Sequence, residues 1–509
     1  MKDSICAPCD VLRDYGVWKL SDTTPQKQQE LWINGRAVAP KDGRYFETYN
    51  PGTGQSICEV AEATTSDVDA AVHAAREAFV DWKAQSGVAR GRVLAALAAK
   101  VREHRDELAW LETLDGGKPI AETPEADVDS GADCLEYFAG QAASLQGEYQ
   151  EVDGGFFYTR PEPLGVCGGI GAWNYPLQII CWKCAPALAA GNTMVFKPSE
   201  LTPLSAIRFA ELAKEAGLPD GVLNIVPGAE EAGRGLTQHS SIDKISLTGG
   251  VDTGKNVMRD AAGTLKEVSL ELGGKSPILV FDDADVDDAV SGAILGNFYT
   301  QGEICTNGTR VFVHESVREA FLTKLIERTR ALKIGDPKAA DTDVGAMISQ
   351  AHMEHVLEYM RIGREEGAKP LIGGERVSVS GCESGWYVAP TVFDGCTDDM
   401  RIVCEEIFGP VMSVLTFSDE EEAIARANQT PFGLAAGVFT TDLGRAHRVA
   451  GELEAGICWV NDYNVTPIEM PFGGIKESGI GKENSRRALE SYTRLKSVFV
   501  AKGAVDAPY

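Results

Sequence analysis

The chain has 509 residues, which is too long for one compact core and predicts two or three domains. Its net charge of −27 argues against nucleic acid and anionic lipid as partners; it is compatible with a cationic substrate, although solubility is the simpler explanation. No apolar run reaches the roughly 18 residues of a membrane span, and the acidic start lacks the features of a signal or transit peptide, so we expect a cytoplasmic protein.

Twelve cysteines are scattered along the chain, which indicates free thiols in a reducing compartment. Two CxxC pairs occur, Cys6–Cys9 and Cys181–Cys184, but neither has a second pair at zinc-site spacing. His352 and His355 lack an HExxH pattern and are expected on the surface of a helix. We therefore predict no metal site.

The first part of the chain predicts an extension, short strands and then helices. Residues 1–25 are polar and aperiodic, so we expect them to be loosely ordered. Leu31–Ile33 is a predicted strand and is followed by an Asn34-Gly35 turn. Apolar residues at helical spacing then predict helices over 67–82, 90–114 and about 127–144.

From residue 165 strands and helices alternate. Thr202, Pro203 and Gly217 are predicted as the cap, the first position and the end of a helix between two strands. The alternation implies a parallel, doubly wound sheet with ligands at the carboxyl ends of its strands. The expected strands are 165–170, 193–196, 222–226, 244–247 and 278–281.

A second α/β series follows. We expect a helix from Asp285 to about Phe298, and a capping box at Ser316-Val-Arg-Glu319 that opens the next helix. The expected strands are 311–314, 411–417, 436–439 and 456–460. Residues 494–500 alternate in polarity and are predicted as an edge strand of the kind that pairs with another subunit.

Four segments carry residue types that suit chemistry, although each alone has a plainer interpretation. Residues 248–254, TGGVDTG, suit a pyrophosphate at a helix N-terminus, or a simple turn. Lys197 and Glu200 suit the ribose hydroxyls of a nucleotide, or an exposed charged turn. Glu271 suits a general base whose pKa is raised by burial. Cys305 is either a nucleophile or a buried inert thiol.

In their order and spacing these segments resemble the aldehyde dehydrogenase superfamily over about residues 28–500. Further matches are Ala172-Trp-Asn-Tyr-Pro176, Glu405-Glu-Ile-Phe-Gly-Pro410, and Met470-Pro-Phe-Gly-Gly474 with Lys476, Ser478 and Gly479. The resemblance implies an α/β fold with two doubly wound parallel-sheet domains and an oligomerisation β-hairpin. The implied parts are an NAD-binding domain (26–148 and 168–276), a catalytic domain (277–472) and an oligomerisation segment (149–167 and 484–503). A homodimer or homotetramer is expected.

The resemblance also implies a mechanism. Cys305 attacks the aldehyde as a thiolate, and the Asn174 amide and the Cys305 backbone N–H hold the oxyanion. Glu271 then activates the water that hydrolyses the thioester. Lys183 and Glu483 match a buried pair that either relays a proton from Glu271 or is purely structural.

The implied cofactor is NAD. A carboxylate at Glu200 would repel a 2′-phosphate, which favours NAD over NADP. Gly250 stands where many members of the superfamily have serine, so that position keeps only a backbone contact. The implied cofactor contacts are Trp173, Lys197, Glu200, Gly249, Gly250, Gly254, Leu272, Glu406 and Phe408.

Within the superfamily, residues 297–310 and 459–471 look most like betaine aldehyde and 4-trimethylaminobutyraldehyde dehydrogenases. A quaternary ammonium group is bound by aromatic faces because it forms no hydrogen bonds. Tyr175 and Trp182, seven residues apart, are predicted on one helix face, and Ile457 is predicted to narrow the pocket and favour the longer aldehyde. A tunnel for ordinary aliphatic aldehydes or aminoaldehydes is the other interpretation. The predicted substrate contacts are Tyr175, Trp182, Ile457, Trp459 and Phe472.

Two other functional classes remain to be considered. Acylating relatives release the thioester to coenzyme A and need no general base, so the presence of Glu271 favours hydrolysis. A non-enzymatic structural protein could keep the fold, but intact Asn174, Glu271 and Cys305 argue against it.

Overall fold

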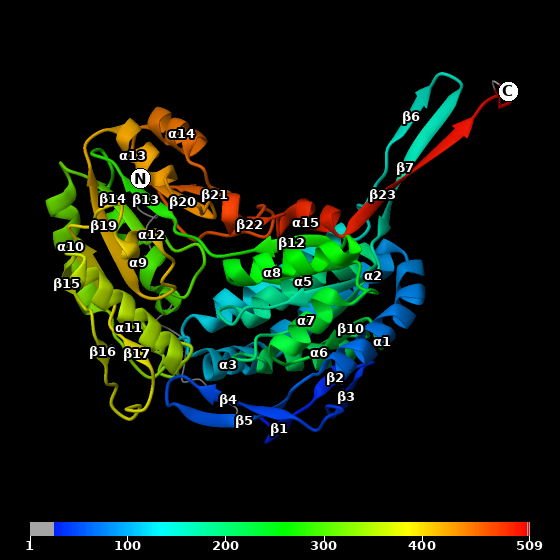
Figure 1. Ribbon diagram of the computed structural model, residues 1–509, viewed down its shortest axis with the longest axis horizontal. Helices are drawn as coiled ribbons and strands as arrows, with labels where there is room; N and C mark the ends of the chain where they lie inside the picture. Colours follow the sequence, from blue (N-terminus) through cyan, green and yellow to red (C-terminus); the bar gives the residue numbers. More distant parts are fainter. Residues whose placement is uncertain (1–24, 506, 508) are drawn as a thin grey trace, which may run out of the picture.

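The computed structural model describes residues 25–505, 507 and 509; the predicted extension, apart from residue 25, and the Cys6–Cys9 pair lie outside them. The chain forms two lobes, each built on one large sheet, and a three-stranded arm that projects from one lobe (Figure 1). Two small sheets complete the structure: β1 (Gln28–Gln29) with β5 (Gln55–Ala61) and β4 (Tyr45–Asn50), and β16 (Arg376–Val377) with β17 (Tyr387–Val388). None of the described helices has both the length and the apolar character needed to cross a bilayer.

The first large sheet confirms the predicted doubly wound architecture. Helices cover both of its faces, and its five central strands, β12 to β10 in the order below, are parallel. One face packs on α1 (Thr65–Ala84), α7 (Glu230–Gln238) and α8 (Val251–Ala261), and the other on α5 (Pro176–Ala190) and α6 (Leu204–Glu215). The strand order is β22 (Gly479–Ile480), β12 (Glu267–Glu271), β11 (Lys244–Thr248), β8 (Val166–Ile170), β9 (Thr193–Lys197), β10 (Leu223–Ile225), β2 (Leu31–Ile33) and β3 (Arg36–Val38).

The glycines of β8 make room for the neighbouring strand. A Cβ atom on Gly169 or on Gly171 would lie 2.7 Å from the ring of Phe196, which belongs to the neighbouring strand β9. Packing therefore explains this glycine-rich run, whose spacing does not match a dinucleotide fingerprint.

Several predicted helix boundaries are wrong. The helix expected over 90–114 breaks at His104 into α2 (Gly87–Glu103) and α3 (Arg105–Gly116). The helix expected at about 127–144 is α4 (Ser130–Gln141), which follows a π-helical turn, η2 (Pro124–Asp129).

Two predicted caps are also wrong. At α6, Thr202 makes no cap, because the Asp115 carboxylate of α3 accepts the Leu204 N–H at 3.2 Å. Ser316 does not open α10 (Arg318–Ala331), because its hydroxyl group bonds to His314 Nδ1 instead.

The second large sheet is also doubly wound and is parallel except for β15. Asp285 caps α9 (Val286–Phe298) as predicted. The strand order is β15 (Lys369–Ile372), β18 (Thr391–Asp394), β19 (Val411–Phe417), β14 (Arg310–His314), β13 (Pro277–Val280), β20 (Ala435–Phe439) and β21 (Ile457–Val460). The helices of this lobe besides α9 and α10 are α11 (Gln350–Glu365), α12 (Arg401–Cys404), α13 (Glu420–Asn428) and α14 (Leu443–Glu452).

The two sheets present opposite strand ends to one another. Glu271 ends β12 and Gly249 directly follows β11, so the first sheet contributes the carboxyl ends of its strands, as predicted. Cys305 precedes β14 and Glu406 precedes β19, so the second sheet contributes its amino ends.

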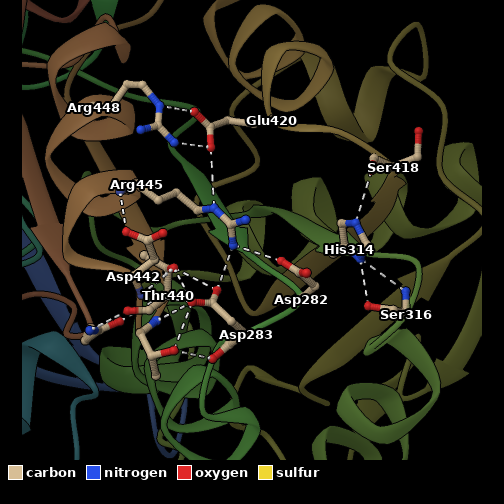
Figure 2. A network of polar contacts seen from close by, with 12 residues as sticks. Asp282, Asp283, His314, Ser316, Ser418, Glu420, Thr440, Asp442, Arg445 and Arg448 are labelled. Carbon is tan, nitrogen blue, oxygen red and sulfur yellow. Dashed lines mark hydrogen bonds and ion pairs between the residues drawn. The ribbon is translucent and has the colours of Figure 1, made fainter.

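The carboxyl ends of β13 and β20 carry a polar network instead (Figure 2). Asp283 is its centre and accepts hydrogen bonds from Thr440 Oγ1 (2.7 Å), Thr441 N (3.0 Å), Asp442 N (2.8 Å) and Arg445 Nη1 (2.8 Å). Burial acts to raise the pKa of Asp283, but these hydrogen bonds and the charge of Arg445 outweigh it and lower the pKa to about 2. The network fills the crevice where this topology would otherwise place a ligand.

We expect Asp283→Asn to lower the free energy of unfolding at pH 7 by about 1–3 kcal/mol, because it weakens several charge-assisted hydrogen bonds. Because the pKa of Asp283 is lower in the folded than in the unfolded protein (about 3.9), its ionised form stabilises the fold at a pH above about 4. The difference in stability between parent and variant should therefore disappear as the pH falls from about 4 to about 2. Urea unfolding across this range measures it. The control is Asp282→Asn, which removes only a half-exposed ion pair with Arg445 and should change stability by less than about 1 kcal/mol. Equal effects of the two substitutions would contradict the prediction.

The arm consists of β6 (Tyr149–Val152), β7 (Gly155–Pro163) and β23 (Thr493–Ala501). β23 pairs antiparallel with β7 along its whole length and has a free outer edge, which confirms the predicted edge strand. Its apolar side chains Leu495 and Phe499 are 68% and 58% exposed. Between the last strand of the first sheet and the arm, α15 (Ser485–Ser491) packs against α5 and α4.

Candidate active site

A cavity of about 890 Å³ lies where the two sheets present their strand ends, and it brings together residues from distant parts of the chain. Most of the residues singled out in the sequence line it. They are Trp173, Asn174, Tyr175, Trp182, Gly249, Gly250, Glu271, Leu272, Cys305, Glu406, Phe408 and Phe472. The others, which do not line it, are Lys183, Lys197, Glu200, Gly254, Ile457, Trp459 and Glu483.

Cys305 is partly exposed in this cavity and follows the turn Tyr299–Gly302. Burial raises the pKa of its thiol to about 12, and the charges of Glu271 and Glu406 add to the effect. A base must therefore take the proton of this thiol before it can attack as the expected thiolate.

Asn174 lies in the loop between β8 and α5, with its side chain buried. Its Nδ2 donates a hydrogen bond of 2.9 Å to the backbone oxygen of Glu303, two residues before Cys305. A carboxamide nitrogen has two hydrogens, so this bond orients the side chain and leaves a second donor for another acceptor.

Glu271 is the last residue of β12 and is buried. Among the described residues neither of its carboxyl oxygens has a hydrogen-bond partner. Burial raises its pKa well above the usual value, the charge of Glu483 adds to this, and the charge of Lys183 opposes it. A carboxyl group of this kind suits a base that takes up and releases protons during a reaction.

Lys183 and Glu483 form a fully buried ion pair of 2.9 Å, and both also contact the Ser246 hydroxyl group at 3.0 Å. The pair lies close enough to influence the pKa of Glu271, but no hydrogen bond joins it to that carboxyl group. Its geometry is compatible both with a structural pair and with one step of a proton relay.

Lys197 ends β9, and its ammonium group donates to the backbone oxygens of Gly228 (2.5 Å) and Pro198 (2.9 Å). The Glu200 carboxylate lies 3.4 Å from the same ammonium group and is 48% exposed. Nearby, Gly250 is the N-cap of α8 and has no side chain to occupy the free N–H groups of the first turn. This corner therefore offers positive dipole ends and a carboxylate to a ligand.

Glu406 and Phe408 approach the cavity from the other lobe. Glu406 accepts the Gly274 N–H at 2.8 Å, and burial raises its pKa to about 7. Phe408 has a φ of +60° and packs edge-on against Trp173, with 5.1 Å between ring centres. His352, which the sequence placed on a surface, is instead packed against Trp173 and donates to the Phe408 oxygen at 2.7 Å.

The aromatic wall differs in part from the prediction. Tyr175 precedes α5 as its N-cap, so it does not share a helix face with Trp182, although both line the cavity. Trp182 packs on Phe472 with 5.0 Å between ring centres. Tyr463 also lines the cavity.

Trp459 and Ile457 lie behind this wall. Asn461 and Asn464 both have left-handed backbones, and Tyr463 between them lies beside the cavity but is fully buried, with its hydroxyl group donating to the Thr306 backbone oxygen at 2.7 Å. Trp459 packs on Tyr463 with 4.7 Å between ring centres and donates its indole N–H to the Val465 oxygen. Trp459 and Ile457 therefore stay predicted substrate contacts that do not line the cavity in this structure.

The outer part of the cavity is acidic, a feature that none of the sequence motifs predicts. Arg102 pairs with the carboxylates that lie along the α4 side, whereas no ion pair of Glu125 or Glu469 occurs within residues 25–505. The regular spacing of acidic residues after Pro124 was the signal that could have revealed this surface. The acidic residues that line it are Glu125, Asp129, Asp133, Glu136 and Glu469.

The chain is similar to known proteins over nearly its whole length. Residues 38–498 match the family model described as the aldehyde dehydrogenase family. The betaine aldehyde dehydrogenases of Vibrio vulnificus and Brucella anthropi are 53% and 52% identical, over 94% and 95% of this chain and 99% of each relative. The NAD+ complex of an aldehyde dehydrogenase from Bacillus cereus superposes with a TM-score of 0.92 at 44% identity, over 94% of this chain and 97% of that one. The chain belongs to the aldehyde dehydrogenase family.

Proposed function

We propose that this protein oxidises a trimethylammonium aldehyde to the carboxylic acid, with NAD as the oxidant and water as the second substrate. The observation that carries the proposal is that Cys305, Asn174 and Glu271 meet in one cavity whose wall is aromatic and whose mouth is acidic. Two relatives at more than half identity are described as betaine aldehyde dehydrogenases, and a 44% identical structure is an NAD+ complex.

The residues at the cofactor end suit NAD. The open N-terminus of α8 at Gly250 suits a pyrophosphate, and the exposed Glu200 carboxylate beside Lys197 suits unphosphorylated ribose hydroxyls. Trp173, Glu406 and Phe408 would hold the nicotinamide end. Gly249, Gly254 and Leu272 complete the set, with Gly254 supporting the site by packing on Leu272. When bound, NAD takes the hydride from the substrate carbon.

The chain itself supplies the proton transfers and the nucleophile. Glu271 takes the proton of the Cys305 thiol, and Cys305 Sγ bonds to the aldehyde carbon. The second hydrogen of Asn174 Nδ2 and the Cys305 backbone N–H stabilise the resulting oxyanion. Glu271 gives up this proton before hydrolysis and, once ionised again, takes a proton from water, whose oxygen attacks the thioester carbon. The carbon–sulfur bond then breaks to release the acid, and the leaving Cys305 thiolate takes the proton back from Glu271. The Lys183–Glu483 pair receives the proton from Glu271 or supports the site structurally.

The cationic substrate follows from the wall and the mouth of the cavity. Tyr175, Trp182 and Phe472 offer aromatic faces to a trimethylammonium group, each contact contributing about 0.5–2 kcal/mol. The acidic mouth attracts a cation from solution. Ile457 does not line the cavity, which weakens the argument for a longer aldehyde, and the relatives favour betaine aldehyde.

We further propose the domain division 26–148 with 168–276 for the cofactor, 277–472 for the nucleophile, and 149–167 with 484–503 for assembly. The free edge of β23, with exposed Leu495 and Phe499, supports a homodimer or homotetramer that pairs arms across subunits. A cytoplasmic location is part of the same proposal.

The experiment is a substrate panel with NAD and NADP in parallel. The kcat/KM for betaine aldehyde should exceed that for hexanal by about 10-fold or more, since two or more cation–π contacts are lost with the neutral chain. NAD should be preferred to NADP, and coenzyme A should leave the steady-state rate unchanged. Equal efficiency on hexanal would contradict the cationic substrate, and a requirement for coenzyme A would contradict hydrolysis. 4-Trimethylaminobutyraldehyde in the same panel tests the chain length.

A further inference from the structure

The turn that leads into Cys305 has a strained backbone. Thr300, Gln301 and Gly302 are consecutive left-handed residues, with φ of +50°, +42° and +76°. The left-handed region is unfavourable for a β-branched residue such as threonine. At Gly302 a Cβ atom would lie 2.3 Å from the carbonyl carbon of Gly409, so only glycine allows this close approach. Such a backbone persists only where surrounding contacts hold it.

The carboxyl group of Glu122 provides such contacts from the opposite side. Its Oε2 accepts hydrogen bonds from both the backbone N–H and the hydroxyl group of Thr300, each at 3.1 Å. Glu122 comes from the segment between α3 and the π-helical turn, 178 residues earlier in the chain, and is 8% exposed. Because both donors of one residue end on one oxygen, the backbone and the side chain of Thr300 are oriented together.

Thr300 also connects the turn to the substrate wall. The hydroxyl groups of Thr300 and Tyr175 lie 2.9 Å apart. The single hydroxyl hydrogen of Thr300 is directed to Glu122, so Tyr175 donates to the Thr300 oxygen. On the ring of Tyr175, the buried Lys118 ammonium lies 4.2 Å from the ring centre. Asn174 directly precedes Tyr175, so the hydrogen-bonded chain also reaches the loop that carries the amide donor.

We propose that Glu122 is a positioning residue for the oxidation: its carboxyl oxygen holds Thr300, and through it the Tyr175 wall and the turn that places the Cys305 thiol. The inference rests on the proposed function, because it concerns the geometry of that reaction. Glu122 itself lines no part of the cavity and acts through Thr300. Loss of the acceptor oxygen therefore misplaces the thiol relative to a bound aldehyde but does not remove any group that touches it.

The test compares Glu122→Met, which has no acceptor, with Glu122→Gln, whose amide oxygen can receive both bonds from Thr300. Three quantities are measured: kcat and KM with betaine aldehyde, the rate at which iodoacetamide alkylates Cys305 (followed by peptide mass spectrometry), and the Kd for NAD. Glu122→Met should lower kcat by about 10-fold or more and change the alkylation rate, because small displacements of reacting groups have large effects on rate. Its Kd for NAD should stay at the parent value. In Glu122→Gln, both kcat and the rate of Cys305 alkylation should be close to those of the parent.

Asp67 offers a matched control far from the cavity. Like Glu122, it is buried, and one of its two carboxyl oxygens, Oδ2, accepts hydrogen bonds from both the backbone N–H (2.9 Å) and the hydroxyl group (2.8 Å) of one residue, Thr64. Asp67→Leu should lower Tm but leave kcat and Cys305 alkylation unchanged. If Glu122→Met does not fold, Thr300→Val takes its place with the same expected loss.

Parent-like kcat and alkylation in Glu122→Met, or in Thr300→Val, would overturn the inference. Equal losses in Glu122→Met and Glu122→Gln would also overturn it, because the acceptor oxygen would then be irrelevant. A parent protein that oxidises no aldehyde with NAD would refute the proposed function instead, and the alkylation rates would still test the role of Glu122.

Discussion

Replacing Cys305 by alanine is expected to abolish NAD-dependent aldehyde oxidation and to leave NAD binding intact. Cys305 is the thiol that lines the cavity together with Asn174 and Glu271, and removal of a covalent nucleophile typically lowers kcat by about 10⁴-fold or more. The side chain is small, and its bond to the substrate forms only during the reaction. The Kd for NAD, measured by calorimetry, should therefore stay within about twofold of the parent value.

Cys404→Ala is the matched control for this variant. Cys404 is an exposed thiol in the same lobe and is the last residue of α12. Its sulfur contacts the backbone oxygen of Asp398. Its removal should leave kcat unchanged. Retained aldehyde oxidation in Cys305→Ala would contradict the assignment of the nucleophile, and loss of activity in both variants would indicate general damage by thiol replacement.

The features that the sequence predicts well are those set by neighbouring residues. Buried strands such as Val411–Phe417 are mostly apolar, so their bounds follow from the residues themselves. The Asp285 cap is also local, because its carboxylate accepts the N–H groups of Asp287 and Asp288. The residues that meet in the cavity were named from family motifs, and the topology brings them together from both sheets.

The misses have a common physical cause, which is that a distant part of the chain decides the outcome. The α6 cap comes from Asp115 of another helix, so Thr202 is not needed. Trp459 packs on Tyr463 and donates its indole N–H to the Val465 oxygen, so contacts across the turn at Asn461 and Asn464, which the motif alone does not encode, fix the position of its ring. The raised pKa of the Cys305 thiol likewise depends on burial and on the charges of Glu271 and Glu406, which the local motif does not encode.

In the proposed mechanism Glu271 accepts a proton twice, first from the Cys305 thiol and later from water, and one variant can test both steps. In Glu271→Gln the side chain keeps its size but accepts no proton, so hydrolysis of the thioester should become rate-limiting. The steady-state kcat should fall by about 10²–10⁴-fold, which is the usual contribution of general base catalysis. One equivalent of NADH per site should form first, more slowly than in the parent, because the neutral thiol also loses its base.

The pH dependence gives this prediction its sharpest form. Burial raises the pKa of Glu271, so in the parent the base is protonated at low pH and kcat should rise as the pH increases through that raised value. In Glu271→Gln this rise should be absent. Glu267→Gln is the control, since Glu267 begins the same strand, β12, but is exposed, and its kcat and pH profile should match the parent. A parent-like steady state in Glu271→Gln, or an unchanged pH profile, would show that water is activated elsewhere; the buried Lys183–Glu483 pair would then be the group to test, because its charges already influence the Glu271 carboxyl group.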